Sequence, residues 1–175
     1  MEKKRIWELG RDSVETYREK RKLPLVLVVD NVRSLNNIGA MFRTADAFLV
    51  ERMALCGISS PPPSPEIHKT ALGAEETVAW EYYADTMDAV AKLRADGYTI
   101  CCLEQVKGSV ALQDFKVSDS EKYAIVVGNE VDGVDQRVVD ASDVALEIPQ
   151  YGTKHSLNVS VSAALSLWQF FIQLT

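Results

Sequence analysis

Hydrophobic residues follow two alternating patterns along this chain. Short runs that are almost continuously apolar and often β-branched are typical of strands buried in a parallel sheet. These runs lie at residues 25–29, 53–56, 98–103, 123–127 and 145–148, and an aromatic patch at 80–83 has strand character as well. Apolar residues recur at helical spacing in segments 38–48, 88–95 and 135–141 and at Val161, Leu165 and Trp168. Strands that alternate with helices predict an α/β domain with a mostly parallel sheet flanked by helices.

The first residues of the chain differ from the rest in charge. Residues 1–22 hold eight Lys and Arg against five acidic residues, a net charge of +3, whereas the remaining 11 basic and 20 acidic residues give −9. A sparse apolar face at helical spacing over 3–21 ends at Pro24. We therefore expect a basic N-terminal helical extension over residues 1–23 and the main domain over 24–175. Such an extension fits either contacts with phosphates or a solvated surface helix.

Composition narrows the class of protein. Hydrophobic residues make up 47% of the chain and charged residues 25%, as in a folded globular domain. No window approaches the roughly 18 apolar residues of a membrane span, and the N-terminus lacks the apolar core of a secretory signal. The three cysteines lack zinc spacing, and Cys101 and Cys102 lie in an apolar run, so core positions are favoured over a catalytic thiol. We expect a cytoplasmic protein with no membrane partner and no metal.

Polar residues of unusual kinds follow three of the expected strands. The strand at 25–29 leads to Asn36, Asn37 and Arg43, the strand at 123–127 leads to Gly128, Asn129 and Glu130, and the last strand leads to Ser156 and Asn158. In open α/β sheets, ligands bind beyond the carboxyl ends of the strands. The three segments together therefore predict a site for a polar ligand at one end of the sheet.

Each of these residues also has an ordinary structural interpretation. The asparagines and Ser156 are frequent helix caps or turn residues, Arg43 fits a surface or interface ion pair, and Glu130 fits an exposed turn. The chain has no GxGxxG after the first strand, no GxxxxGK[ST] and no GxSxG. These absences argue against dinucleotide-binding Rossmann domains, P-loop proteins and α/β-hydrolases. The residues alone indicate an α/β domain that binds a polar ligand.

Three longer segments carry a family resemblance. They read NVRSLNNIGAMFRTADAF (31–48), IVVGNEVDGV (125–134) and IPQYGTKHSLNVSVSAAL (148–165). In this order they resemble the motifs of the SpoU-type (TrmH-like) RNA 2′-O-ribose methyltransferases of the SPOUT superfamily. The resemblance implies that residues 24–175 form the methyltransferase domain, with a deep trefoil knot near its C-terminus. It also implies S-adenosylmethionine as cofactor, RNA as substrate, with tRNA favoured over rRNA, and a homodimer.

The resemblance further implies roles for single residues. Arg43 would act at the reacting 2′-hydroxyl and face the cofactor of the other subunit. Because a guanidinium, with a pKa above about 12, resists deprotonation, two roles stay open: Arg43 accepts the hydroxyl proton, or it stays charged and stabilises a developing alkoxide. The other implied catalytic residues are Asn37, Glu130, Ser156 and Asn158, and the implied cofactor-binding residues are Leu103, Gly128, Ile148 and Leu157.

One departure and several rival functions accompany this resemblance. Gln150 stands where the third motif would have Met, a difference that concerns the shape of the cofactor pocket rather than the reaction class. The rivals are an rRNA 2′-O-ribose methyltransferase, a non-catalytic RNA-binding protein of the same fold, and a generic nucleotide-binding α/β module. Transfer of a labelled methyl group to RNA separates the enzymes from the other two.

Overall fold

The strand β1 (Leu23–Asp30) is central to the sheet because its residues are apolar on both faces. From Leu25 to Val29 no side chain has exposed surface. On one side β1 pairs in parallel with β2 (Val50–Cys56), and on the other with β6 (Lys122–Val127). The computed structural model, which describes residues 1–10 and 12–175, confirms the buried parallel strand expected at 25–29.

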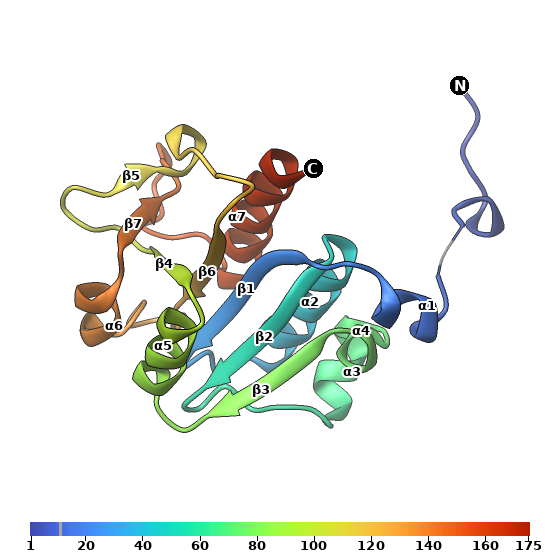
Figure 1. The fold of residues 1–175 in the computed structure, drawn as a ribbon, viewed down its shortest axis with the longest axis horizontal. Helices are drawn as coiled ribbons and strands as arrows, with labels where there is room; N and C mark the ends of the chain where they lie inside the picture. Colours follow the sequence, from blue (N-terminus) through green and yellow to red (C-terminus); the bar gives the residue numbers. More distant parts are fainter. Residues whose placement is uncertain (11) are drawn as a thin grey trace.

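The sheet has seven strands in the order β3-β2-β1-β6-β4-β7-β5, and every pairing is parallel (Figure 1). The remaining strands are β3 (Ala79–Tyr83), β4 (Tyr98–Leu103), β5 (Val110–Ala111) and β7 (Val144–Glu147). The prediction of a mostly parallel sheet is therefore confirmed, although the pattern did not reveal the two-residue β5. Since all strands point the same way, their carboxyl ends gather at one end of the domain.

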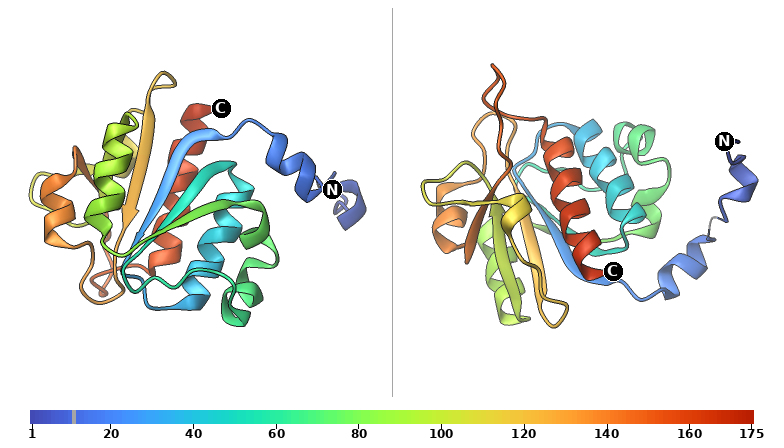
Figure 2. Two further views of the ribbon diagram at one scale, coloured as in Figure 1. Left: turned by 60° about the horizontal axis from the view of Figure 1, so that its bottom comes forward. Right: turned by 90° about the horizontal axis from the view of Figure 1, so that it is seen from above.

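Helices cover both faces of the sheet (Figure 2). One face carries α2 (Leu35–Ala47), α3 (Pro65–Ala71), α4 (Ala74–Thr77) and α7 (Val159–Leu174), and the other carries α5 (Thr86–Ala95) and α6 (Gln136–Ala141). Each face of the sheet has its own hydrophobic core, and alternate side chains of β1 belong to one or the other. Leu25 and Leu27 pack under the first group of helices, and Val26 and Val28 under the second. A short 3-10 turn, η2 (Leu112–Asp114), follows β5. Among the described helices, none has both the length and the apolar character that a membrane span requires.

The N-terminal extension is not the continuous helix expected over 3–21. The structure has a 3-10 turn, η1 (Ile6–Glu8), and a separate helix, α1 (Val14–Glu19). Gly10 lies between them with a φ of 56°, a left-handed conformation that ends helical structure. Ser13 then starts α1 afresh, because its Oγ accepts a hydrogen bond from the Thr16 amide. Arg11, one of the basic residues counted in this segment, lies outside the described residues.

Helix α2, which carries Asn37 and Arg43, packs closely against α3 at Gly39. A Cβ added to Gly39 would lie 2.1 Å from Thr70 Oγ1 and 2.4 Å from the carbonyl oxygen of Ile67. The same Thr70 hydroxyl donates a hydrogen bond to the carbonyl of Asn36, at 3.0 Å. The two helices therefore approach so closely that only glycine fits at this contact.

Replacing Gly39 with alanine will push α2 away from α3. We expect Gly39→Ala to lower the free energy of unfolding by about 1–3 kcal/mol, the usual cost of overpacking, as measured by urea denaturation. Gly152→Ala serves as the control, since no atom lies within 4 Å of its added Cβ. Coincident urea midpoints for Gly39→Ala and the unmodified protein would contradict this account of the helix contact.

Candidate functional site

The carboxyl ends of β4, β6 and β7 open into one cavity of about 500 Å³. Three segments form its walls: 103–105 at the end of β4, 127–133 at the end of β6, and residues from the last two of β7 to the first turn of α7. The structure brings together the four residues expected to bind a cofactor, since the lining includes Leu103, Gly128, Ile148 and Leu157. Three of the five expected catalytic residues, Glu130, Ser156 and Asn158, line the same cavity.

A tight loop after β6 forms one wall of the cavity. The backbones of Asn129 and Gly133 exchange two hydrogen bonds, at 2.9 and 3.0 Å. The Asn129 side-chain oxygen also accepts the amides of Val131 and Asp132, at 2.8 and 3.1 Å. The loop folds back so closely that a Cβ at Gly128 would lie 2.2 Å from the Gly133 carbonyl carbon. Glycine at 128 is therefore required for the wall to close.

A hydrogen-bond network joins the three polar segments. Glu130 Oε1 accepts the Ser34 amide and the Asn37 side-chain amide, each at 3.0 Å, and Oε2 accepts the Arg33 amide at 3.0 Å. Asn37 Oδ1 in turn accepts from the Asn158 side-chain amide at 3.2 Å. Three residues from segments far apart in the chain thus meet beside the cavity.

The charge state of Glu130 follows from these contacts. Partial burial acts to raise the pKa of Glu130, but the hydrogen bonds from the Arg33 and Ser34 amides and from Asn37 outweigh it and lower the pKa below its usual 4.5. The carboxylate is therefore ionised at neutral pH and occupied as an acceptor. This arrangement suits an anchor between α2 and the loop better than it suits a proton-accepting base.

The capping interpretations are partly wrong. Ser34, not Asn36 or Asn37, caps α2, because its Oγ accepts the Asn37 amide at 3.3 Å. At α7 the cap is Asn158 rather than Ser156, since Asn158 Oδ1 accepts the Ser160 amide at 2.9 Å. Asn158 therefore both starts α7 and contacts Asn37, while Ser156 is an exposed residue of the cavity wall.

Arg43 stands apart from the cavity of its own chain. It lies on the exposed side of α2 and does not belong to the lining residues. Within the described part of the chain its guanidinium forms no ion pair, so the structure gives no support to the surface ion-pair interpretation. Asn37, although it does not line the cavity either, is tied to it through Glu130 and Asn158.

Several residues of the cavity wall were not predicted from the sequence. Glu104 is the first residue after β4, so the rule that ligands bind at strand carboxyl ends applied to it as well. Gln105 and His155 meet across the wall, where the Gln105 side-chain amide donates to the His155 carbonyl at 2.7 Å. No signal in the sequence pointed to that contact, because it joins residues 50 positions apart.

The cysteines are core residues, as expected. Cys56, Cys101 and Cys102 are fully buried and unpaired. Burial raises the pKa of the Cys56 thiol to about 12 and that of Cys101 further still, which disfavours the nucleophilic thiolate. Across residues 1–10 and 12–175, no group of three or more His, Cys, Asp or Glu side chains is placed to hold a metal ion.

Fold and site together define a class: a parallel α/β domain with a polar-edged cavity at the strand carboxyl ends, closed by three separate segments. A model of the SpoU rRNA Methylase family matches residues 24–168. The chain belongs to this family.

Several curated proteins and solved structures that resemble this chain are named as RNA methyltransferases or RNA-modifying enzymes. The 23S rRNA (guanosine-2'-O-)-methyltransferase RlmB of Neisseria meningitidis serogroup B is 33% identical over 144 residues, which cover 82% of this chain and 56% of the relative. The TrmH/SpoU tRNA modifying enzyme of A. aeolicus is 28% identical with a TM-score of 0.80, covering 91% of this chain and 81% of its own. An AdoMet-bound rRNA methyltransferase from Sinorhizobium meliloti has a TM-score of 0.81 at 24% identity, over 91% and 60% of the two chains, and shows the shared fold. The chain thus spans only part of the length of these relatives. It covers 42% of a further relative, a tRNA/rRNA methyltransferase named as uncharacterized from Synechocystis.

The Glu130 anchor predicts a pH-dependent contribution to stability. Because the folded-state pKa lies below 4.5, the ionised carboxylate stabilises the protein above about pH 4.5, and this contribution is lost as the pH falls through the folded-state pKa. Glu130→Gln will therefore be less stable than the unmodified protein at pH 7, and the difference will shrink towards pH 3 in urea denaturation. A difference that is constant from pH 7 to pH 3 would show that the carboxylate charge is not involved.

Proposed function

We propose that this protein transfers a methyl group from S-adenosylmethionine to a ribose 2′-hydroxyl of RNA. The observation that carries the proposal is the meeting of three family motifs around one cavity, joined by Glu130, Asn37 and Asn158. Family membership supports a methyltransferase. The RlmB relative is named for the guanosine 2′-oxygen, which supports the ribose hydroxyl as acceptor.

The cavity fits the proposed cofactor by its shape and chemistry. Gly128 lets the loop fold back against Gly133 and Val134, which gives the cavity a closed backbone wall beside its polar edge. Leu103, Ile148 and Leu157 supply apolar surface for an adenosine moiety. Carboxylates in the lining suit the positive charges of a sulfonium and an ammonium group, and they come from Glu104, Asp132 and Glu147. The solved relative from Sinorhizobium meliloti is named as AdoMet bound.

The chain's own residues would act by alignment and charge. When bound, S-adenosylmethionine supplies an electrophilic methyl group, and the acceptor oxygen must lie in line with it and lose its proton. We assign Arg43 to the 2′-oxygen, with Asn37, Glu130, Ser156 and Asn158 completing the catalytic site. Because a guanidinium holds its proton, we favour Arg43 as a charged donor that stabilises the developing alkoxide while the hydroxyl proton passes to solvent water.

A homodimer accounts for the position of Arg43. The stripe formed by Val161, Leu165, Trp168 and Ile172 follows one side of α7, and each of these side chains is 42–48% exposed. This contrasts with the fully buried Leu167 and Phe170 on the inner side of the same helix. Helix α7 packs beside α2, whose exposed side carries Arg43. A second copy of this chain seated on the stripe would bury it and bring Arg43 towards the partner's cavity.

The C-terminal trefoil knot is part of the proposal. The chain leaves β7, near one edge of the sheet, and returns as α7 beside α2 on the face of the central strands (Figure 2). The returning segment 148–158 passes the wall residues 103–105, where Gln105 holds the His155 carbonyl. A return through a loop, rather than around it, would enclose the cavity as the family resemblance implies.

We favour tRNA as the RNA class, with rRNA as the alternative. A solved relative is named as a tRNA modifying enzyme and another relative as acting on 23S rRNA, so both outcomes have a precedent. We further propose that residues 24–175 act as the methyltransferase domain and that the basic extension 1–23 contacts phosphates. Lys3, Lys4 and Arg5 of the extension are exposed, as such contacts require.

Incubation with labelled S-adenosylmethionine and total RNA tests the activity. We expect label in RNA at a 2′-O-methyl position, mapped in gel-separated tRNA and rRNA fractions. Arg43→Ala should lower kcat by at least about a hundredfold while cofactor binding is retained. Arg43→Lys separates the two roles in part, since near-normal activity would exclude any role that needs the planar guanidinium.

The control for Arg43 is Arg94→Ala, which removes an exposed arginine of α5 on the opposite face of the sheet. Its activity should match that of the unmodified protein. Cofactor binding without transfer to any RNA would favour the non-catalytic RNA-binding alternative. Transfer that is unaffected by Arg43→Ala would remove Arg43 from the catalytic site.

The dimer is tested with a charge on the α7 stripe. Leu165→Glu should convert the protein from a dimer to a monomer of 19.4 kDa in light scattering, because a carboxylate buried in an apolar interface is left unpaired. Ala91→Glu is the matched control, since it places the same carboxylate on the exposed side of α5. A monomeric unmodified protein, or a Leu165→Glu variant that stays dimeric, contradicts this interface.

A further inference from the structure

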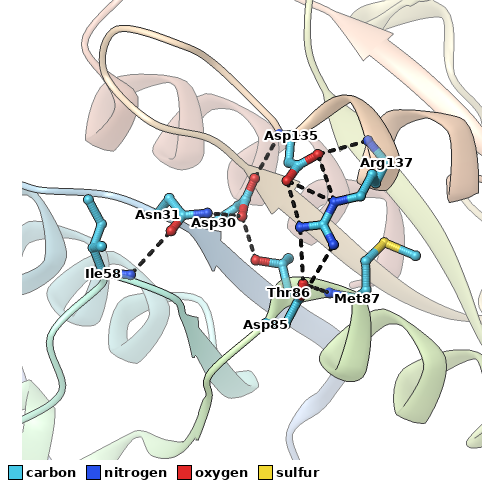
Figure 3. Close-up of polar contacts among 8 residues, drawn as sticks. All are labelled: Asp30, Asn31, Ile58, Asp85, Thr86, Met87, Asp135 and Arg137. Atoms are coloured by element: carbon cyan, nitrogen blue, oxygen red, sulfur yellow. Dashed lines mark hydrogen bonds and ion pairs between the residues drawn. The ribbon is translucent and has the colours of Figure 1, made fainter.

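A buried carboxylate at the end of β1 has no role in the site described so far. Asp30 is 1% exposed and accepts three hydrogen bonds (Figure 3). Its Oδ1 accepts the Asn31 side-chain amide at 2.9 Å and the Thr86 hydroxyl, and its Oδ2 accepts the Asp135 amide at 2.8 Å. All three donors are neutral, so hydrogen bonding alone compensates the burial of this group.

The Asp135 amide lies at the end of the cavity-wall loop, residues 128–135. The preceding amide, that of Val134, is held by a second carboxylate, Glu104 Oε2, at 3.0 Å. Asp30 is the last residue of β1 and Glu104 follows β4, and these two strands flank β6, from which the loop leaves. Two successive amides of the loop are thus held by carboxylates from the strands on either side.

The other end of the loop is tied to the same place. The Asn129 side-chain amide donates to the Asn31 carbonyl at 2.7 Å. Asn31 is itself fixed, because its side chain donates to Asp30 and accepts the Ile58 amide at 3.2 Å. The loop is therefore anchored around Asp30 at Asn129, near its start, and at Asp135, its last residue, with Glu130 between them.

We propose that Asp30 and Glu104 are positioning residues that clamp the loop 128–135 in the conformation that binds the cofactor. The inference rests on the proposed function, because it assigns the cavity to S-adenosylmethionine. Asp30 does not line the cavity, so its effect on binding must act through the loop. Glu104 lines the cavity and holds the loop as well.

The test compares three variants with the unmodified full chain. In Asp30→Asn and Glu104→Gln an NH₂ group replaces one of two accepting oxygens, and the remaining oxygen cannot serve all the donors that the carboxylate serves now. Arg137→Gln is the matched control, because Arg137 lies in the same cluster and pairs with Asp85 and Asp135 at the surface but binds no loop amide (Figure 3). Calorimetry measures affinity for S-adenosylhomocysteine, and hydrogen exchange measures protection of the Val134 and Asp135 amides without ligand.

We expect Asp30→Asn and Glu104→Gln to weaken binding by at least about tenfold, as unpaired buried donors do, while thermal unfolding stays cooperative. Asp30→Asn should expose the Asp135 amide to exchange, and Glu104→Gln the Val134 amide. Arg137→Gln should bind within about twofold of the unmodified protein. If Asp30→Asn fails to fold, the exchange of the Val134 amide in Glu104→Gln carries the test, because that measurement does not depend on a contact between Glu104 and the cofactor.

Normal binding and normal amide protection in both carboxylate variants would overturn the clamp. Equal losses of binding in Arg137→Gln and Asp30→Asn would also overturn it, because the effect would then be a general loss of stability. An unmodified protein that binds neither S-adenosylmethionine nor S-adenosylhomocysteine contradicts the proposed function instead. The exchange measurement still decides the clamp in that case, since it needs no ligand.

Discussion

Parallel pairing of all seven strands is the constraint on which this structure depends. It directs every strand's carboxyl end to one side, so segments that follow β1, β4, β6 and β7 converge although they are scattered along the chain. The backbone and side-chain groups at that end then satisfy one another. The carboxylate of Glu130 shows this most clearly, since it accepts amides from the segment after β1 while belonging to the loop after β6.

Local pattern predicted every described strand except the two-residue β5, and the helices α2, α5, α6 and α7 but not α3 and α4, because burial leaves a periodic trace. The run at 25–29 is apolar on both faces in the structure as in the pattern. The prediction of one continuous N-terminal helix was wrong because it relied on the helical spacing of a few apolar residues. Gly10, whose backbone is left-handed, divides the segment into two short helical pieces. The stripe at Val161, Leu165 and Trp168 was correctly helical, yet spacing alone gave no hint that it faces outward.

The sequence predicted which residues line the site better than it predicted the contacts among them. Most of the predicted site residues do line the cavity, because strand ends and family motifs are local signals that a short stretch of sequence contains. The caps were assigned to the wrong neighbours, since Ser34 and Asn158 compete with equally suitable side chains two or three positions away. Contacts such as Glu104 with Val134 depend on which strands become neighbours, and no window of sequence contains that information.

The close seat of α2 on α3 has a consequence for genetics. Helix α2 carries Asn37 at its start and Arg43 further along, so any shift of its axis displaces both groups together. Bulky replacements at Gly39 or Thr70 would therefore surface in a mutational screen as loss-of-function alleles, although neither residue lines the cavity. Such alleles would identify residues that hold α2 in position rather than residues that line the cavity.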